Sequence, residues 1–145
     1  MDKEQYLKLE NQLCFSLYAC SKEVMKLYRS ELERFDMTFP QYLVMLVLWE
    51  HEKLTVNELG KHLFLDSGTL TPMLKRMEAV QLVERVRLKE DERKVLITPT
   101  KKGRALKEAI ACVPERIAPQ FHLTQEEYLQ LLKQLQTITA QLQSN

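Results

Sequence analysis

Several features that define common protein classes are scarce or missing in this sequence. Its three cysteines are an odd number without CxxC spacing, which argues against a paired disulfide scaffold and a zinc knuckle. The longest apolar run, residues 42–49, is about half as long as a membrane span. The charged N-terminus has no apolar signal core, and no glycine-rich phosphate loop or nucleophile elbow is present. We therefore expect a cytoplasmic protein without a metal, a cofactor or a membrane partner.

The composition is ordinary for a globular protein, but the charge is unevenly distributed. The chain has 145 residues, of which 45% are hydrophobic and 28% charged, and its net charge is +1. This length suits one domain with a sizeable core. Residues 75–107 hold 11 Lys and Arg against 5 Asp and Glu, whereas residues 1–74 and 108–145 are mildly acidic. Such a basic segment is often only a solvated surface, but here it also suits contact with a polyanion.

Apolar periodicity predicts helices over most of the chain. One long helix is expected from about residue 4 to residue 34, which contain no Gly or Pro. A second helix is expected to start at Pro40, a residue suited to a first turn. Thr55 and Glu58 have capping-box spacing and open a short helix that ends near residue 63.

A turn and a further helix follow. Residues 64–68 read as the turn, and Asp66 and Ser67 are candidate caps for a helix that ends near Val80. Pro72 would cost this helix a hydrogen bond unless it lies in the first turn, so the start of the helix stays open.

The periodicity then changes from that of a helix to that of a strand. In residues 82–89 the apolar Val86 and Leu88 alternate with three basic side chains, Arg85, Arg87 and Lys89. Residues 94–98 form a second candidate strand, and a charged loop joins the two. The pattern predicts a hairpin with basic side chains along one face and at its tip.

Two more helices close the chain. Thr100 can cap one of them, and Thr124 and Glu127 form a capping box before an amphipathic C-terminal helix. The order of elements predicts a mainly α protein with a small β-hairpin wing, which is a winged helix-turn-helix. Residues 1–145 are interpreted as a single domain, with the DNA-binding lobe at about 37–99. The helices at about 1–36 and 100–145 carry apolar faces that suggest a dimerisation layer.

Two stretches resemble a known family. Residues 66–78, Asp-Ser-Gly-Thr-Leu-Thr-Pro-Met-Leu-Lys-Arg-Met-Glu, with the later Asp91–Arg93, resemble the MarR family of dimeric winged-helix repressors. Residues 11–18, Asn-Gln-Leu-Cys-Phe-Ser-Leu-Tyr, resemble its OhrR-like, peroxide-sensing branch. The resemblance covers essentially the whole chain. It implies a homodimer that binds a pseudo-palindromic operator in double-stranded DNA, with an organic hydroperoxide or related oxidant as inducer.

The resemblance also implies which residues meet DNA. Hydroxyl side chains at the start of a recognition helix can approach bases and phosphates, apolar ones can touch thymine methyls, and basic ones can bind phosphate or guanine. In the family, an arginine steadied by an aspartate enters the minor groove from the wing tip, which here maps to Arg93 and Asp91. The candidate DNA-binding residues are Ser67, Thr69, Leu70, Thr71, Pro72, Lys75, Arg76, Arg85, Arg87, Asp91 and Arg93.

Cys14 is the candidate redox sensor, although a cysteine on an apolar helix face is often merely packed. Along one continuous helix Cys14 and Tyr28 lie about 21 Å apart, so they cannot meet within one subunit. The resemblance implies two antiparallel copies of this helix, with the hydroxyls of Tyr18 and of the other subunit's Tyr28 hydrogen-bonded to the Cys14 thiolate. Such bonds favour the thiolate, which is the species that attacks a peroxide. Oxidation of Cys14 would then release the DNA.

The later oxidation chemistry stays open at this point. Cys20 lies about 9 Å along the expected helix from Cys14 and about 120° around it, beyond disulfide reach. Cys112 is the candidate resolving cysteine, through a disulfide with Cys14 of the other subunit. The alternative is a mixed disulfide with a low-molecular-weight thiol. Phe39 stands where the family often has a tyrosine, so one hydroxyl is missing.

Two other functions fit parts of the same pattern. A MarR-type repressor released by a small phenolic or apolar ligand would need no redox role for Cys14, and a Cys14→Ser variant would respond normally. A thiol peroxidase would turn over peroxide with a reductant, and the basic hairpin would then have no purpose. We therefore interpret the chain as a repressor and not an enzyme.

Overall fold

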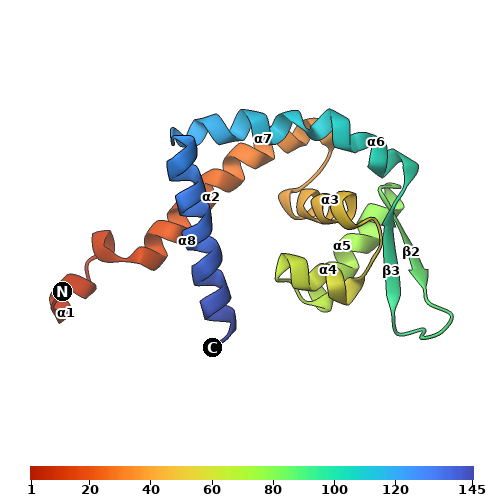
Figure 1. Ribbon diagram of the computed structural model, residues 1–145, viewed down its shortest axis with the longest axis horizontal. Helices are drawn as coiled ribbons and strands as arrows, with labels where there is room; N and C mark the ends of the chain where they lie inside the picture. The colour runs from red at the N-terminus through yellow and green to blue at the C-terminus, as the bar shows by residue number, and fades with distance from the viewer. The chain divides into compact units, whose positions relative to one another are not determined.

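The structure is a computed structural model that describes residues 1–145. It is mainly helical with one small antiparallel sheet (Figure 1), which confirms the expected fold class. In chain order the elements are α1 (Lys3–Tyr6), η1 (Leu9–Asn11), α2 (Leu13–Leu32), η2 (Glu33–Phe35), α3 (Phe39–His51), β1 (Leu54–Thr55), α4 (Val56–Leu63), α5 (Ser67–Ala79), β2 (Val83–Arg87), β3 (Val95–Pro99), α6 (Lys101–Ile110), α7 (Cys112–Ile117), η3 (Ala118–Phe121) and α8 (Gln125–Gln143). The chain divides into two compact units, Met1–Val113 and Pro114–Asn145. None of the helices combines the length and apolarity needed to cross a membrane.

The N-terminal segment is not the single long helix that the periodicity predicts. It breaks between α1 and α2, where Lys8 and Gln12 have extended backbone conformations. The Asn11 side chain donates to the main-chain carbonyl and the side-chain oxygen of Gln5, at 2.9 and 3.1 Å, and the Gln12 side chain donates to a carbonyl of α1. Such side-chain bonds to the backbone compete with helix formation, which apolar spacing alone does not register. Cys14 therefore lies in the first turn of α2 rather than in mid-helix.

The helix-turn-helix begins with α3. The Thr38 hydroxyl accepts a hydrogen bond from the Gln41 backbone N–H at 3.3 Å, and the Gln41 side chain accepts one from the Thr38 N–H at 3.1 Å. This reciprocal cap places Pro40 in the first turn, where its missing N–H costs nothing. The expected start of this helix near Pro40 is confirmed.

The next two helices also start at side-chain caps that the sequence indicates. Thr55 accepts from the N–H of Glu58 at 3.2 Å, and Asp66 accepts from the N–H of Thr69 at 2.7 Å. Pro72 lies inside α5, beyond its first turn. The helix therefore forms in spite of the hydrogen bond that Pro72 cannot donate, because its cap and its buried face stabilise it.

The turn between α4 and α5 requires a glycine. A Cβ added at Gly60 would lie 2.4 Å from the Leu65 carbonyl oxygen and 3.3 Å from the Leu70 side chain. The Leu65 N–H donates to the Gly60 carbonyl at 3.0 Å, and Phe64 has a left-handed backbone conformation with a φ of 57°. Gly60 thus permits the close approach that sets α5 against α4.

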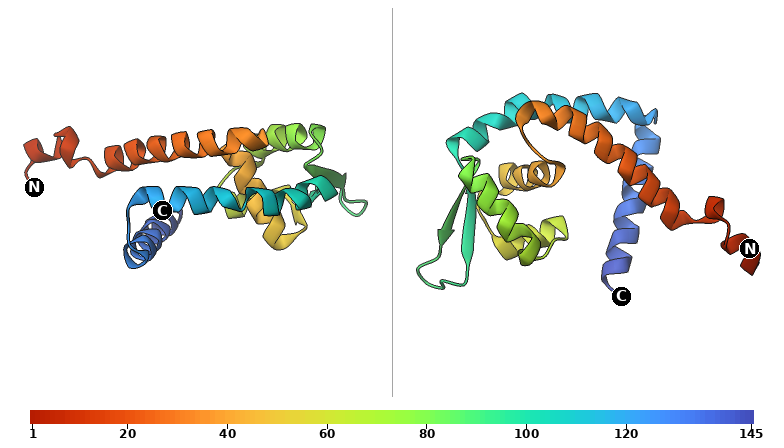
Figure 2. Two further views of the ribbon diagram at one scale, coloured as in Figure 1. Left: turned by 90° about the horizontal axis from the view of Figure 1, so that it is seen from above. Right: turned by 180° about the vertical axis from the view of Figure 1, so that it is seen from behind.

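The sheet has three strands in the order β1-β3-β2, all antiparallel. β2 and β3 form the expected hairpin, which extends away from the helices of the first unit (Figures 1 and 2). β1 was not expected, because two residues are too few to show strand periodicity. It pairs with β3 through Leu54 and Ile97, which leaves β2 as an edge strand.

The core of the first unit lies where α3, α4, α5 and α6 meet the sheet. Its residues are at most 2% exposed and include Leu32, Val44, Met45, Leu48, Leu59, Leu70, Leu74, Met77, Val83, Ile97 and Ile110. Thr100 caps α6 as expected by accepting from the Gly103 N–H at 3.0 Å, and the Trp49 ring N–H donates to the Gly103 carbonyl at 2.9 Å. The first bond caps α6 directly after β3, and the second attaches α6 to α3.

The second unit consists mainly of α8. The capping box at Thr124 and Glu127 is confirmed, with hydrogen bonds of 2.8 and 3.2 Å. None of the residues of α8 is buried. Its apolar side chains recur every three or four residues and are 38–66% exposed: Tyr128, Leu131, Leu132, Leu135, Ile138 and Leu142.

Candidate functional site

A basic hollow lies between α4, α5 and the hairpin. It contains six Lys or Arg side chains and one carboxylate, so its field attracts a polyanion. The lining residues are Thr55, Val56, Asn57, Glu58, Lys61, Ser67, Thr71, Lys75, Arg85, Arg87, Arg93, Lys94 and Val95. The fold therefore brings together six of the candidate DNA-binding residues, which are 26 positions apart at their extremes, from Ser67 to Arg93.

The start of α5 presents its polar side chains to solvent. Ser67, Thr69 and Pro72 are exposed and Thr71 is half-buried. The hydrogen bond from the Thr69 backbone N–H lowers the pKa of the Asp66 carboxyl, so this cap is ionised at neutral pH. Lys75 and Arg76, further along α5, are exposed as well.

Leu70 does not fit the proposed thymine contact. Its side chain is fully buried, and it packs near Gly60 in the helix-turn-helix core. Leu70 was expected to touch a thymine methyl, but a helix that packs on a core must bury one side. Leu70 is therefore a core residue.

The wing tip is organised around Asp91. Its carboxylate accepts from the Arg93 backbone N–H at 3.1 Å and from the guanidinium at 3.1 and 3.4 Å. The guanidinium is the first cause of a lowered pKa of the Asp91 carboxyl. The Arg93 side chain remains 91% exposed, and Arg87 donates to the Glu92 carbonyl at 2.9 Å. Asp91 thus orients a guanidinium that is still accessible to a ligand.

Apolar and basic side chains alternate along β2 as expected, but the apolar Val86 is exposed and the basic Arg85 is largely buried. Val86 is 55% exposed, whereas the Arg85 side chain is only 16% exposed. Arg85 faces α5, where its guanidinium lies 3.7 Å from the Glu78 carboxylate. Val86 has only its cross-strand partner Leu96 opposite it on the outer face of the hairpin and remains largely exposed, so the sequence pattern of β2 does not report burial.

Cys14 is exposed in the first turn of α2, and Tyr18 lies one turn further along the same helix. The Tyr18 ring is 62% exposed, and the Lys22 ammonium lies 5.3 Å from the ring centroid. No side chain caps the start of α2. Cys14 is therefore an accessible thiol beside the positive end of a helix.

Tyr28 belongs to a ring cluster near the other end of α2. Its ring centroid lies 4.6 Å from that of Phe39 and 5.8 Å from that of Tyr42. Burial, and secondarily the neighbouring Tyr28, raises the pKa of the Tyr42 hydroxyl, which therefore stays protonated. Phe39 thus packs directly against Tyr28, at the position where the family often has a tyrosine. Fourteen helical positions, about 21 Å, separate Tyr28 from Cys14.

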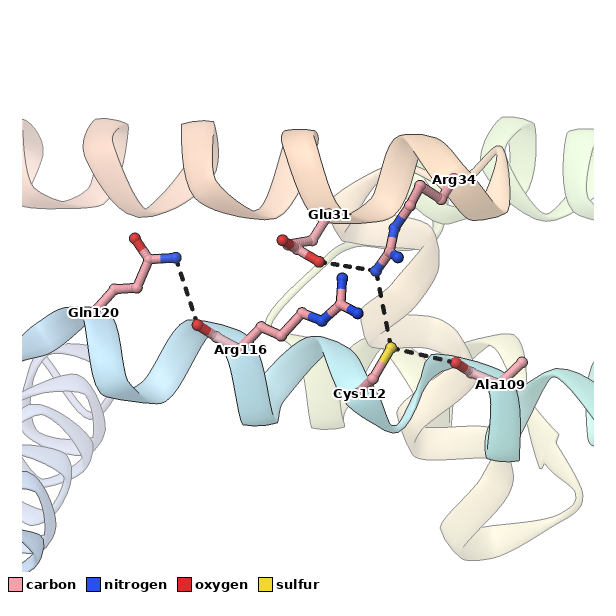
Figure 3. A network of polar contacts seen from close by, with 6 residues as sticks. All are labelled: Glu31, Arg34, Ala109, Cys112, Arg116 and Gln120. Carbon is pink, nitrogen blue, oxygen red and sulfur yellow. Dashed lines mark hydrogen bonds and ion pairs between the residues drawn. The ribbon is translucent and has the colours of Figure 1, made fainter.

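Cys112 is half-buried at the start of α7 and has a cationic neighbour (Figure 3). Its sulfur lies 3.9 Å from the Arg34 guanidinium and donates to the Ala109 carbonyl at 3.5 Å. Arg34 is also paired with Glu31 at 3.0 Å. Cys20 is exposed on α2, and all three cysteines are free thiols.

A second hollow lies where α2 meets α3. It is lined by Met25, Arg29, Glu33, Asp36, Met37, Thr38, Phe39 and Pro40. Its apolar side chains, together with one guanidinium and two carboxylates, could accommodate a small ligand that has an apolar body and polar groups. This hollow is the candidate binding site for the alternative function, in which a small phenolic or apolar ligand releases the repressor from DNA.

A capped helix that faces a basic hairpin across one hollow defines a winged-helix DNA-binding protein. The family model described as transcriptional regulator SarA/Rot matches residues 26–110 of the chain. The chain is also 50% identical over 137 residues to the organic hydroperoxide resistance transcriptional regulator of Bacillus subtilis (strain 168). The aligned residues cover 94% of this chain and 93% of that protein.

Solved structures agree with this assignment. The structure of reduced AbfR bound to DNA has a TM-score of 0.81 and 38% identity, and covers 97% of this chain and 99% of that one. A disulfide-formed structure of AbfR, a protein of Staphylococcus epidermidis, has a TM-score of 0.69 and 43% identity over 92% of this chain and 96% of that one. The chain belongs to the MarR family of winged-helix regulators and to its OhrR-like branch. It is a DNA-binding, cysteine redox-sensing transcriptional regulator and not an enzyme.

Proposed function

We propose that the chain acts in the cytoplasm as a homodimeric repressor that releases its operator when an organic hydroperoxide oxidises Cys14. The observation that carries this proposal is the exposed Cys14 thiol in the uncapped first turn of α2, one turn from Tyr18. The name of the Bacillus subtilis relative supports the class of inducer. AbfR is known bound to DNA in a reduced and in an overoxidized form, and also with a disulfide formed, which supports a cysteine that changes its oxidation state in a DNA-binding protein.

The homodimer is supported by apolar surface at both ends of the chain. Leu13, Phe15 and Leu17, around Cys14, are 41–67% exposed, and α8 presents the apolar row described above. Exposed apolar surface of this extent marks an interaction site, and a second copy is self-complementary about a twofold axis. Two antiparallel copies of α2 would bring Cys14 to Tyr28 of the partner subunit. The two recognition helices would lie about one DNA turn, ~34 Å, apart on a pseudo-palindrome.

The DNA contacts would come from both sides of the basic hollow. Ser67, Thr69, Thr71 and Pro72 would enter the major groove at the start of α5, with Lys75 and Arg76 on phosphate or guanine. Arg87 and Arg93 would reach the backbone and the minor groove from the wing, with Asp91 as the support of Arg93.

The oxidation would proceed in two balanced steps. The Cys14 thiolate attacks the terminal peroxide oxygen, an S–O bond forms as the O–O bond breaks, and a proton converts the leaving alkoxide into an alcohol. The resulting sulfenic acid is attacked by a second thiol, which forms a disulfide and releases water. That thiol is Cys112 of the partner subunit or a low-molecular-weight thiol.

Release of DNA follows from the placement of this chemistry in a packed interface. The added oxygen, and later a larger disulfide partner, must fit between Tyr18 and Tyr28 of the partner subunit. Overpacking costs about 1–3 kcal/mol per site and is commonly relieved by shifts of rigid elements. α2 continues from Cys14 to the helix-turn-helix, so such a shift would change the separation of the recognition helices. About 1.4 kcal/mol of difference already changes the affinity tenfold.

The test is a DNA-shift titration with an organic hydroperoxide, hydrogen peroxide and hypochlorite. The duplex is one selected from a randomised pool by the reduced wild-type protein. We expect Cys14→Ser to bind this duplex like the wild type and to remain bound after oxidant, whereas the matched control Cys20→Ser is released. Release of Cys14→Ser by organic hydroperoxide would refute the sensor assignment. On a non-reducing gel, Cys112→Ser should lack a linked dimer but should still lose one free thiol.

The hollow beside Phe39 supports a second candidate, release by a small phenolic or apolar ligand. In that case Cys14→Ser would release DNA in response to the ligand as readily as the wild type does. The same variant therefore separates the two candidates.

A further inference from the structure

Glu78 connects the recognition helix to the wing in a way that DNA contact alone does not explain. It lies in the last turn of α5, and its side chain is 43% exposed. One carboxylate oxygen accepts from the Arg85 backbone N–H at 3.2 Å, and the other lies 3.7 Å from the Arg85 guanidinium. Both oxygens of one side chain of α5 are therefore engaged by a single residue of β2.

The backbone contact follows from the sheet topology. β2 is an edge strand, so alternate N–H groups point away from β3 and have no strand partner. Arg85 is such a residue, and the Glu78 carboxylate takes the place of a neighbouring strand. A charged acceptor makes this a stronger hydrogen bond than a neutral one would be.

The guanidinium contact depends on the same carboxylate. The Arg85 side chain is only 16% exposed, and its Nε is buried without a hydrogen-bond partner. An arginine held this way has little freedom to turn outward, and it relies on Glu78 to balance its charge. Loss of one member of such a pair leaves the other partly buried and unpaired.

We propose that Glu78 and Arg85 are a positioning pair that holds the wing at a set angle to α5, and that Arg85 is not a DNA contact. This inference rests on the proposed wing contact of Arg93. Arg85 is the middle residue of β2, and the strand from Arg85 to the tip loop is about 13 Å long. A rotation of the hairpin by about 10° about this point moves the tip by about 2 Å, which is enough to break a hydrogen bond. The pair thus allows α5 and Arg93 to meet one duplex at the same time.

The test is operator binding over a range of salt concentrations with the selected duplex described above. Glu84 is the matched control for Glu78, because it is an exposed carboxylate on β2, directly before Arg85. Removal of a negative charge near DNA should tighten binding, so Glu84→Gln should bind slightly more tightly than the wild type. Glu78→Gln should instead bind about tenfold more weakly with an unchanged salt slope. Binding of Glu78→Gln as tight as that of Glu84→Gln would overturn the proposal.

A second arm tests Arg85 itself and remains decisive if Glu78→Gln does not fold. A direct phosphate contact contributes about 0.9 to the slope of log affinity against log salt, hence about 2 per dimer. Arg87→Gln should show that reduction, whereas Arg85→Gln should weaken binding with the wild-type slope. A reduced slope for Arg85→Gln would make it a DNA contact and refute its positioning role.

A double-variant cycle separates this inference from the wing contact. Arg93→Ala should weaken binding strongly in the wild-type background and by a smaller factor when combined with Glu78→Gln, because the tip is then already misplaced. If Arg93→Ala alone has no effect, the wing contact is wrong. If its effect is equal in both backgrounds, the wing contact stands and the positioning role is wrong.

Discussion

The winged-helix lobe and the terminal helices bury their apolar residues to very different extents. In α3, α4, α5 and the sheet, positions such as Leu48, Leu74 and Ile97 are completely buried within one chain. In α8 none of the residues is buried, and in α2 only Leu32 is. The lobe therefore has a hydrophobic core of its own, whereas the terminal helices carry apolar rows that suit a second copy.

Leu135→Asp should separate the two regions most clearly. A charge in the middle of the apolar row of α8 should abolish the dimer and weaken operator binding at least about 100-fold, or ~2.7 kcal/mol. The lobe should keep its helical circular dichroism, because its core does not involve α8. Sedimentation measures the dimer, and Thr137→Asp, on the opposite side of α8, should stay dimeric. A dimeric Leu135→Asp protein would contradict the contrast.

Gly60→Ala should damage the lobe and leave the terminal helices intact. The new Cβ would lie 2.4 Å from the Leu65 carbonyl oxygen. Helix α4 would therefore have to move away from the turn that connects it to α5. We expect a loss of about 1–3 kcal/mol in the free energy of unfolding at fixed protein concentration. Denaturant titration measures it. Gly68→Ala is the control, since its Cβ would contact only the Asp66 side chain, at 3.2 Å.

Arg93→Ala should affect only DNA binding. Its guanidinium is 91% exposed and is held by Asp91 rather than by the core. Operator affinity should fall about 10- to 30-fold, or ~1.4–2 kcal/mol, without a change in unfolding. Arg104→Ala removes the same charge from α6, outside the basic hollow, and should change affinity much less. Equal losses for both variants would mean that only net charge matters.

The smallest effect concerns the cap of α5. Hydrogen bonding lowers the pKa of the Asp66 carboxyl in the folded state, so its contribution to stability is complete above the unfolded pKa of about 3.9. That contribution disappears as the pH falls through the lower folded pKa. Asp66→Asn keeps a capping oxygen without this titration. The wild-type and Asp66→Asn proteins should therefore differ in the slope of unfolding free energy against pH below about pH 4, and not near neutral pH.

Local sequence signals identified most of the helix starts. Thr55, Asp66, Thr100 and Thr124 were all predicted as caps, and each accepts the expected backbone hydrogen bond. Caps can be recognised because the donor and the acceptor are three residues apart in the chain. The same locality explains the prediction of the hairpin from alternation in residues 82–89 and 94–98.

The sequence predictions that were wrong or incomplete concern contacts between residues that are not neighbours in the chain. β1 exists only because β3 lies beside it, and the break before α2 depends on hydrogen bonds from Asn11 and Gln12 to residues six positions earlier. Leu70 and Arg85 were both expected on the DNA surface. Leu70 is in the core, and Arg85 faces Glu78, because burial is decided by which elements pack together.

By itself, then, the sequence determined the helical class, the caps and the basic hairpin, since these depend on residue type and short spacing. The choice of Cys14 as the candidate sensor came from the resemblance to the OhrR-like branch. The tertiary structure decided which side chains share a hollow, which face the core and which residue holds the wing. It did so because those properties depend on residues that are distant in the chain and adjacent in space. Ser67 and Arg93 line one basic hollow only after the turn at Gly60 and the pairing of β2 with β3 have formed.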